Sequence, residues 1–235
     1  MKKAIVLIAL VLSTVGTMAQ GHTGVFSVVP RIGATFSNIT KESVGFGTSS
    51  ELQKGKTQVG LIAGAGLQYQ ALPVLGVSIG TYYQRMGCTY DDTDLSQADA
   101  GEYTVYQRCH TYLDYLSVPL MGHIYVAKNF AINAGVQASF LLSNKIRADI
   151  MHVTIGNDGS YTYRDESEKL DEENKYIRKF DLSIPVGVSY EYENVVLDIR
   201  YQIGLSKLYK SLLDNGSKNK AVVFSAGYKF DLGSI

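Results

Sequence analysis

The feature that most constrains this chain is a set of long stretches in which apolar residues alternate strictly with small or polar ones. In TQVGLIAGAGLQYQ (57–70), Val59, Leu61 and Leu67 share one face while Gly64 lies on the other. This alternation is typical of a β-strand with two different faces. Because glycine packs poorly in a strand, the fold must explain why one face is apolar and the opposite face is so small.

The same pattern recurs along the chain and predicts eight strands. Their expected ranges are 28–38, 57–70, 75–85, 115–126, 130–142, 180–191, 195–206 and 221–232. These stretches run about 11 to 14 residues, roughly twice the usual length of a globular strand and enough to cross a bilayer when tilted. Pro30, Pro119 and Pro185 fall inside predicted strands and predict a bulge or kink at each.

The connections between these strands alternate between tight and long. Short turns are expected at 70–73, 127–129 and 192–194, and long polar connections at 39–56, 87–110, 143–179 and 207–219. The sequence therefore predicts an all-β fold, an eight-stranded antiparallel up-and-down transmembrane β-barrel, with short periplasmic turns and long extracellular loops. The apolar face would contact lipid, and the small polar face would pack inside a narrow lumen. With an even strand number, both termini are expected in the periplasm.

Two alternative folds remain open at this point. A soluble lipocalin-like barrel would turn the apolar face inward around a ligand. A barrel of ten membrane strands would use the stretch DIMHVTIGNDGSYTYR (149–164), whose NDG sequence at 157–159 is a strong hairpin signal. We expect instead that this hairpin lets strands 130–142 and 180–191 project beyond the membrane as a ribbon, because its charged arms have no clean apolar face.

The first nineteen residues predict a signal peptide. Lys2 and Lys3 precede an apolar run of about a dozen residues, and small residues follow before Gln20. Residues 1–19 are thus expected to be removed, leaving one barrel domain over 20–235. No later apolar run approaches the length of a membrane helix. The formal net charge of zero and the pI near 6.9 give no basic surface for a nucleic acid partner.

Charged residues are expected inside the barrel. By phase, six of them fall on the lumen face: Arg31, Asp181, Glu191, Asp198, Arg200 and Lys229. Buried charges must be paired, so we expect one lumen charge network that fills and stiffens the barrel. A gated ion path is the alternative, although the interior of an eight-stranded barrel is normally filled by side chains.

The two cysteines, Cys88 and Cys109, flank the predicted loop 87–110. In an oxidising compartment we expect a disulfide at the base of this loop, worth about 3 kcal/mol in the chain-entropy model. Two free buried thiols are the alternative. No CxxC or Cys/His spacing indicates a metal site.

The sequence offers no catalytic group, no cofactor site and no metal site. Of the histidines His22, His110, His123 and His152, only His123 falls within a predicted strand, and Ser117 lies too far along that strand to act as its nucleophile. The acidic segment at 164–175 lacks the spacing of a calcium loop. We therefore expect a protein that is not an enzyme.

Three stretches resemble the PorT-like outer-membrane β-barrel family, which is common in the Bacteroidota. They are YLSVPLMGHIYV (115–126), LSIPVGVSYEY (182–192) and the ending SAGYKFDL (225–232). The resemblance implies contact with outer-membrane lipid and insertion by the barrel-assembly machinery. Ser117 stands where the family often has glutamate. The founding member is tied to secretion, whereas most relatives have no assigned role.

These observations lead to one function hypothesis and several alternatives. The leading one is a non-enzymatic integral outer-membrane protein with a structural or surface-interaction role through its extracellular loops. A component of a protein secretion system is the first alternative. A small-solute channel and a soluble lipocalin-like binder are the others. The surface or secretion partners are not identified by sequence.

Overall fold

The computed structural model describes residues 23–41, 43–44, 53–96, 98–164, 168–210 and 216–234. The predicted signal peptide, residues 1–19, lies outside these described residues. Within them, no helix is long and apolar enough to cross a membrane.

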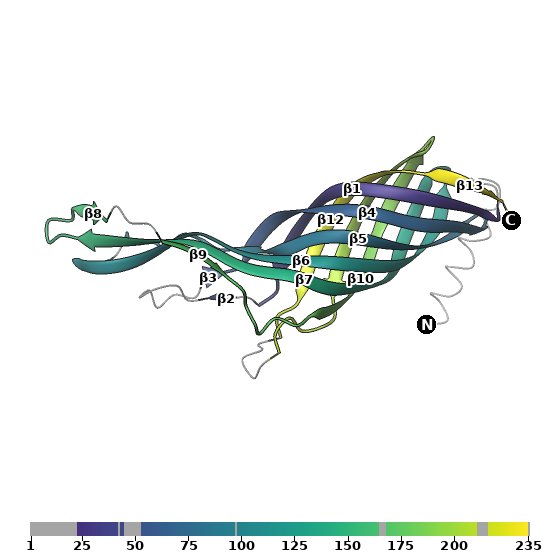
Figure 1. Cartoon of the computed structure of the whole chain (residues 1–235). Helices are drawn as coiled ribbons and strands as arrows, with labels where there is room; N and C mark the ends of the chain where they lie inside the picture. The colour runs from purple at the N-terminus through teal and green to yellow at the C-terminus, as the bar shows by residue number, and fades with distance from the viewer. Residues whose placement is uncertain are drawn as a thin grey trace, which may run out of the picture.

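Eight antiparallel strands close into one ring, as the sequence predicts (Figure 1). Each strand pairs with the next, and pairing of β10 with β7 completes the circle. The strands of the ring are β1 (Val25–Ile39), β4 (Lys56–Leu72), β5 (Leu75–Thr89), β6 (Gly101–Ala127), β7 (Phe130–Ile155), β10 (Phe180–Tyr192), β11 (Val195–Gly204) and β12 (Asn219–Tyr228). The alternative of ten membrane strands is therefore wrong.

Five further short strands lie outside the eight-stranded ring. β13 (Phe230–Ser234) follows β12 and pairs with β1, and β2 (Ser43–Val44) pairs with β3 (Gln53–Lys54). β8 (Tyr161–Tyr163) and β9 (Glu168–Glu172) both pair with β7.

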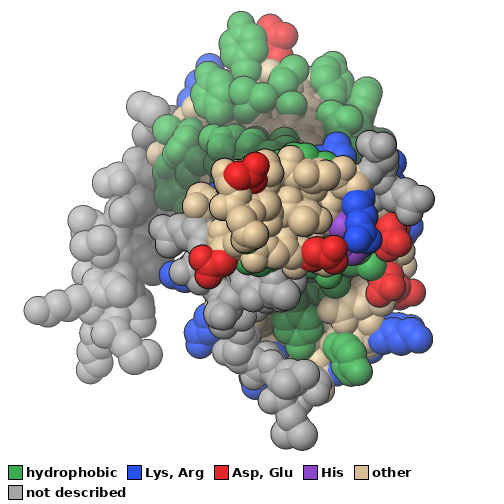
Figure 2. Space-filling view, turned by 90° about the vertical axis from the view of Figure 1, so that its left-hand side faces the viewer, with side chains coloured by type: hydrophobic (Ala, Val, Ile, Leu, Met, Phe, Trp, Pro, Cys, Tyr) green, Lys and Arg blue, Asp and Glu red, His purple; other side chains and the backbone are tan. Residues whose placement is uncertain are grey.

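The large apolar side chains of the ring point outward. Ile32 and Val59 are each 61% exposed, and the same outward orientation holds along every strand of the ring. Figure 2 shows hydrophobic side chains crowding the barrel wall behind the end that faces the viewer. An apolar outer wall suits lipid and not water, so the alternative of an inward-facing lipocalin-like barrel is wrong.

Aromatic side chains gather toward both ends of this apolar wall. Phe36 packs edge-on against Phe224, with 5.6 Å between ring centroids, near the end of the barrel that carries the long connections. Near the opposite end, Tyr228 packs against Phe230 at 4.7 Å, and Tyr192 is well exposed. Two such girdles are typical of barrels that cross the outer membrane.

The lumen is closed toward the long connections by an apolar cluster. Leu113 and Tyr115 of β6 are fully buried there, together with Ile177 and Leu208, which lie in connections outside the ring strands. The backbone beside them is joined by a bridge between Ile177 and Tyr209. The connections after β9 and β11 therefore reach into the mouth of the barrel and fill it.

Two strands of the ring continue far beyond it. β6 and β7 have 27 and 26 residues, and they remain paired from the barrel out to Gly101 opposite Ile155. Figure 1 shows them leaving the barrel as a narrow projection, with β8 near its tip. We call this projection, made of residues 101–107, 149–155 and 161–163, the outer ribbon.

The ribbon corrects two expectations. It is built from the strands predicted at 115–126 and 130–142, extended outward, whereas β10 begins only at Phe180 and does not project. The connection expected over 87–110 shrinks to 90–100, since both flanking strands run further. The hairpin signal at 157–159 is confirmed, because a turn there joins β7 to β8 and Gly159 adopts φ +77°.

The opposite end carries only tight turns. Residues 73–74, 128–129 and 193–194 connect neighbouring strands there. The first described strand and the last, β1 and β13, also meet at this end, where Val25 pairs with Ser234 (Figure 1). Tight turns and chain ends thus share one side of the barrel, and the long connections share the other.

Candidate functional site

The lumen contains the predicted charged residues, but they form three separate groups. Arg31, Asp198 and Arg200 make the first, with side chains 6%, 0% and 8% exposed. Asp198 Oδ2 lies 3.5 Å from Arg31 Nη1, and Asp198 Oδ1 lies 2.6 Å from Arg200 Nε. One carboxylate thus neutralises one of two guanidinium charges.

The other predicted lumen charges lie apart from this group. Lys229 Nζ donates to Glu191 Oε1 at 3.0 Å, near the tight turn between β10 and β11. At the other end of β10, the Asp181 carboxylate accepts a hydrogen bond of 2.8 Å from Ser206 Oγ. These residues occupy different levels of the barrel, and the ion pairs among them join Asp198 to both arginines and Lys229 to Glu191.

Uncharged amides bridge the middle of the lumen. Gln84 of β5 donates through Nε2 to Gln202 Oε1 of β11 at 2.8 Å, across the barrel. Gln202 Nε2 in turn donates to Gln137 Oε1 at 3.1 Å. All three side chains are buried. Sequence analysis assigned no role to these glutamines, since phase alone does not show which residues meet across a lumen.

A serine, a histidine and an asparagine form a hydrogen-bonded chain nearer the tight turns. Ser78 Oγ lies 2.7 Å from His123 Nε2, and His123 Nδ1 lies 2.7 Å from Asn133 Oδ1. Asn133 Nδ2 donates to Asp198 Oδ2 at 3.3 Å. The chain therefore helps to hold the carboxylate that lies between the two arginines.

The serine that contacts His123 is Ser78 and not Ser117, which the sequence placed on the same strand. Ser117 bonds instead to Ser139 Oγ at 2.9 Å and to Gln84. The signal that would have found Ser78 is the register of β5 on β6, which places Gly76 opposite His123 and brings Ser78 one inward position away.

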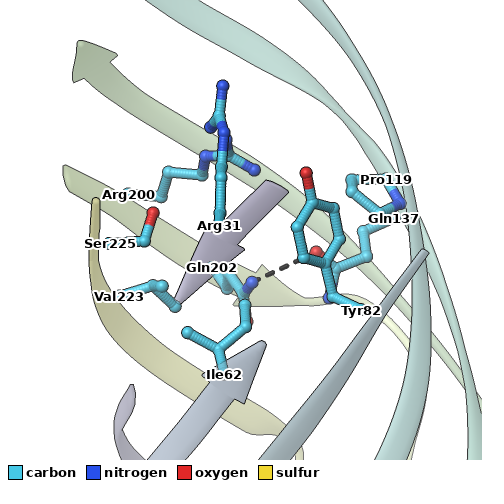
Figure 3. Close-up of a pocket in the computed structure, with 9 residues that line it drawn as sticks. All are labelled: Arg31, Ile62, Tyr82, Pro119, Gln137, Arg200, Gln202, Val223 and Ser225. Atoms are coloured by element: carbon cyan, nitrogen blue, oxygen red, sulfur yellow. Dashed lines mark hydrogen bonds between the residues drawn. The ribbon is translucent and has the colours of Figure 1, made fainter. Parts of the chain in front are cut away.

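A small cavity lies beside the two arginines. It has a volume of about 10 Å³ and is lined by residues from β1, β4, β5, β6, β7, β11 and β12 (Figure 3). Its polar lining comes from Arg31, Tyr82, Gln137, Arg200, Gln202 and Ser225. Neither Ser78 nor His123 lines it, so this space is not a substrate pocket for the serine–histidine chain.

Both cysteines are buried, and the structure does not contain the predicted disulfide. In the strand register, Cys88 lies opposite Thr111, and the carbonyl of Cys109 accepts a hydrogen bond from the amide of Tyr90. The Cys88 thiol itself donates to the Tyr90 hydroxyl at 3.2 Å. The cysteines are thus diagonal neighbours and not a directly facing pair. The alternative of two buried thiols describes the structure.

The outer ribbon is the other candidate surface. Tyr161 and Tyr163 of β8 are 48% and 59% exposed. Arg164 and Glu102 form an ion pair of 3.4 Å across the ribbon. Seen end-on in Figure 2, the tip is mainly polar, with acidic and basic side chains distributed around it. Two hydrogen bonds from Ser160 hold the pKa of Asp158 below its usual range, so this carboxylate is charged at neutral pH.

Metal-binding residues do not gather anywhere in the described part of the chain: no group of three or more His, Cys, Asp or Glu side chains could hold an ion there.

Comparisons with solved structures find other small outer-membrane barrels. The attachment invasion locus protein Ail of Yersinia pestis is 17% identical, with a TM-score of 0.42, covering 89% of this chain and 100% of Ail. Neisserial surface protein A is 17% identical, with a TM-score of 0.39, covering 90% and 99% of the two chains. The outer membrane protease OmpT of Escherichia coli is 11% identical, with a TM-score of 0.38, covering 88% and 96%. A comparison with curated proteins finds no match.

The family comparison covers most of the chain. Residues 18–210 match the family described as outer membrane protein beta-barrel domain. This range includes seven of the ring strands, from β1 to β11, and the structure adds β12, which closes the ring. The chain belongs to the outer membrane protein beta-barrel domain family and is an outer-membrane protein.

Proposed function

We propose that this protein is a non-enzymatic outer-membrane barrel that binds a macromolecular partner outside the cell through the outer ribbon. The observation that carries this proposal is the length of β6 and β7, at 27 and 26 residues. About 9 to 11 residues per strand suffice to cross the membrane, so more than half of each strand serves something other than crossing. We assign the ribbon to the cell exterior because long connections of outer-membrane barrels face outward.

The ribbon offers two means of binding. Exposed tyrosines such as Tyr161 and Tyr163 supply large, rigid, amphipathic contact area at low entropic cost. In addition, residues 101–105 of β6 pair only with β7 among the described residues. The backbone groups on their other edge can pair with an extended segment of a partner. Pairing of β7 with β8 covers the opposite edge of the ribbon.

The lumen supports a role without catalysis or transport. The hydrogen bonds among the buried glutamines cross its centre, and the cluster around Leu113 and Ile177 fills its mouth. His123 is buried within its own hydrogen-bonded chain. A fully inserted protein is expected to stay silent in planar bilayers, and discrete conductance steps would show that the lumen is open.

A photo-crosslinking experiment tests the binding role. A photoreactive phenylalanine replaces Tyr163 in one strain and, as the matched control, the equally exposed Tyr192 at the tight-turn end in another. Irradiation of intact cells in their native setting is expected to give a discrete adduct from position 163 and none from 192. Equal adducts from both positions, or none from 163 under conditions where the barrel is abundant, would contradict a ribbon-borne partner.

A component of a protein secretion system is the second candidate, supported by the resemblance of residues 115–126 and 182–192 to PorT-like barrels. A secretion role places the working contacts at the tight turns on the periplasmic side. A deletion strain that secretes its cargo normally would exclude this candidate, whereas a secretion defect rescued by a ribbon-trimmed variant would favour it over ribbon binding.

A further inference from the structure

We propose that the barrel lumen holds one small monovalent anion, of the size of chloride, between the guanidinium groups of Arg31 and Arg200. This inference concerns the interior of the barrel and is independent of the function proposed for the outer ribbon.

The net charge of the buried groups favours an anion at this position. Arg31 and Arg200 are both more than nine-tenths buried, and each remains a cation at any physiological pH. Among the described residues, only the Asp198 carboxylate lies within ion-pair distance of them, at 3.5 Å from Arg31 and 2.6 Å from Arg200. The group therefore has two positive charges and one negative charge. A buried charge without a partner is strongly unfavourable, so one further negative charge is needed beside the arginines.

The other carboxylates of the lumen face are hydrogen-bonded to other residues. Glu191 accepts two hydrogen bonds from Lys229, and Asp181 is bonded by Ser206 at the far end of β10. Asp231 accepts a hydrogen bond of 2.6 Å from Ser27. None of these carboxylates is within ion-pair distance of Arg31 or Arg200 in the described part of the chain.

The guanidinium groups also have N–H donors that no hydrogen bond within the described residues satisfies. Within the described residues, Arg31 Nε has no acceptor, and Arg31 Nη1 and Arg200 Nε reach Asp198 without the alignment of a hydrogen bond. Arg31 and Arg200 both line the cavity of about 10 Å³. Figure 3 shows the two guanidinium groups side by side, with the Tyr82 ring across from them.

The size of the cavity selects the kind of anion. A space of this volume admits about one water-sized sphere, which chloride or bromide can occupy after a small adjustment of the arginine side chains. Sulfate and phosphate are too large, and an organic carboxylate would require a lumen that is open. A single halide ion is thus the ligand that fits both the charge and the volume.

A salt-exchange experiment measures the effect of this ion. The protein is refolded into detergent in sodium chloride, sodium bromide or sodium gluconate at equal ionic strength, so that the ion is present while the lumen forms. The midpoint of the heat-induced mobility change is expected to be about 5 °C higher in either halide than in gluconate.

Three variants make the result specific. Arg31→Gln leaves Arg200 and Asp198 as a neutral pair, and the halide effect is expected to vanish. Asp198→Asn leaves two surplus positive charges, so the halide effect is expected to grow. Lys229→Gln removes a lumen charge outside the cavity and is expected to keep the halide effect of the original protein.

Crystals grown in sodium bromide decide the matter where a variant does not fold. An anomalous peak between Arg31 and Arg200 in crystals of the original protein is the expected result. No peak at this position, or a halide effect on the midpoint that persists unchanged in Arg31→Gln, would overturn the proposal.

Discussion

At the scale of single residues, one tyrosine explains why a strand can have so many glycines. Tyr82 of β5 lies over the inner wall. A Cβ added to Gly64, Gly66 or Gly80 would come within 2.8, 2.8 and 2.5 Å of Tyr82 atoms. Tyr82 therefore fills the space beside Gly64 and Gly66, whereas a Cβ at Gly60 would meet the Arg85 carbonyl oxygen at 2.2 Å. The outer face of this strand is apolar because it contacts lipid. Its inner face carries small residues at Gly64 and Gly66 because Tyr82 packs over them.

Adding one methyl group beneath this ring is expected to destabilise the barrel. In Gly80→Ala the new Cβ collides with Tyr82 and also meets the Ala65 carbonyl at 3.0 Å, so the cost should be about 1–3 kcal/mol, as for other overpacked sites. Urea unfolding in lipid vesicles, followed by circular dichroism, measures this loss. Gly76→Ala is the matched control, since its nearest contact is 3.4 Å. Equal stability of both variants would contradict the packing of Tyr82.

The Cys109 thiol is expected to react slowly and with a shifted pH profile. Cys109 lies beyond the apolar wall, where burial raises its pKa to about 11, helped by the nearby Asp92 and Asp149. Only the thiolate is alkylated, so at pH 8 the folded protein should react about a hundredfold more slowly than unfolded chain with an ordinary thiol. The rate should rise about tenfold per pH unit until roughly pH 11.

Iodoacetamide labelling of a Cys88→Ser variant, read by mass spectrometry, checks this profile because Cys109 is then the only thiol. An inflection near pH 9 in the folded protein would show that the thiol is not shielded by burial.

Phase in the sequence identified which residues enter the lumen but not which of them meet. Arg31, Asp198 and Arg200 could be assigned to the interior because alternation in a strand has a period of two. Their contacts, and those of Ser78 with His123, depend on how far neighbouring strands are staggered around the ring. That stagger follows from the pairing of all eight strands together, and no single stretch contains it.

At the scale of elements, the three strand prolines interrupt the pairing of neighbouring strands without shifting its register. Opposite Pro30, pairs of β1 with the last strand stop at Val28–Phe230 and resume at Arg31–Gly227, in the same register. A missing proline N–H removes a ladder bond, and β12 and β13 are therefore one strand with a gap at this point. Pro119 and Pro185 leave similar gaps in the β5–β6 and β10–β7 pairing. The expected bulges are absent at all three described positions.

The ribbon was the element least accessible to sequence analysis. Residues 101–110 contain one aliphatic side chain, Val105, among mostly Tyr, Thr, Gln and charged residues, so they lack the run of alternating aliphatic residues that marks the other strands. Such a segment becomes a strand because β7 pairs with it, from Gly101–Ile155 to Gln107–Asp149. Tertiary pairing overrides the local pattern here, as β-propensity depends on context.

Trimming the ribbon is expected to leave the barrel intact. One variant replaces residues 94–105 by Asn-Gly, a turn that suits the adjacent Thr93 and Tyr106, whose backbones are hydrogen-bonded. It also lacks residues 151–164, while β9 still pairs with β7 at 146–150. The apolar cluster at the barrel mouth contains no residue of either deleted segment.

The trimmed protein should therefore keep the heat-dependent gel mobility of a folded barrel within about 5 °C of the original midpoint. Replacement of 94–105 alone serves as the control for the new turn. Loss of the folded band in the trimmed protein would show that the ribbon stabilises the barrel. The length of β6 and β7 would then be explained by stability and would not support a binding role.

At the scale of the whole molecule, the barrel has two unlike ends. One has tight turns and both described chain ends, while the other has an apolar plug and the outer ribbon (Figure 1). A membrane between them separates the ribbon from the tight turns. The binding role proposed for the outer ribbon depends on which of these ends faces outside the cell.

Labelling of single added cysteines in intact cells tests this most directly. Ser160→Cys places a thiol at the exposed ribbon tip, and Lys128→Cys places one in an exposed tight turn, while Cys88 and Cys109 are buried in both. A membrane-impermeant maleimide is expected to label position 160 in intact cells and position 128 only after the outer membrane is permeabilised. Labelling of position 128 but not 160 in intact cells would contradict the account, because the ribbon would then lie inside the cell envelope.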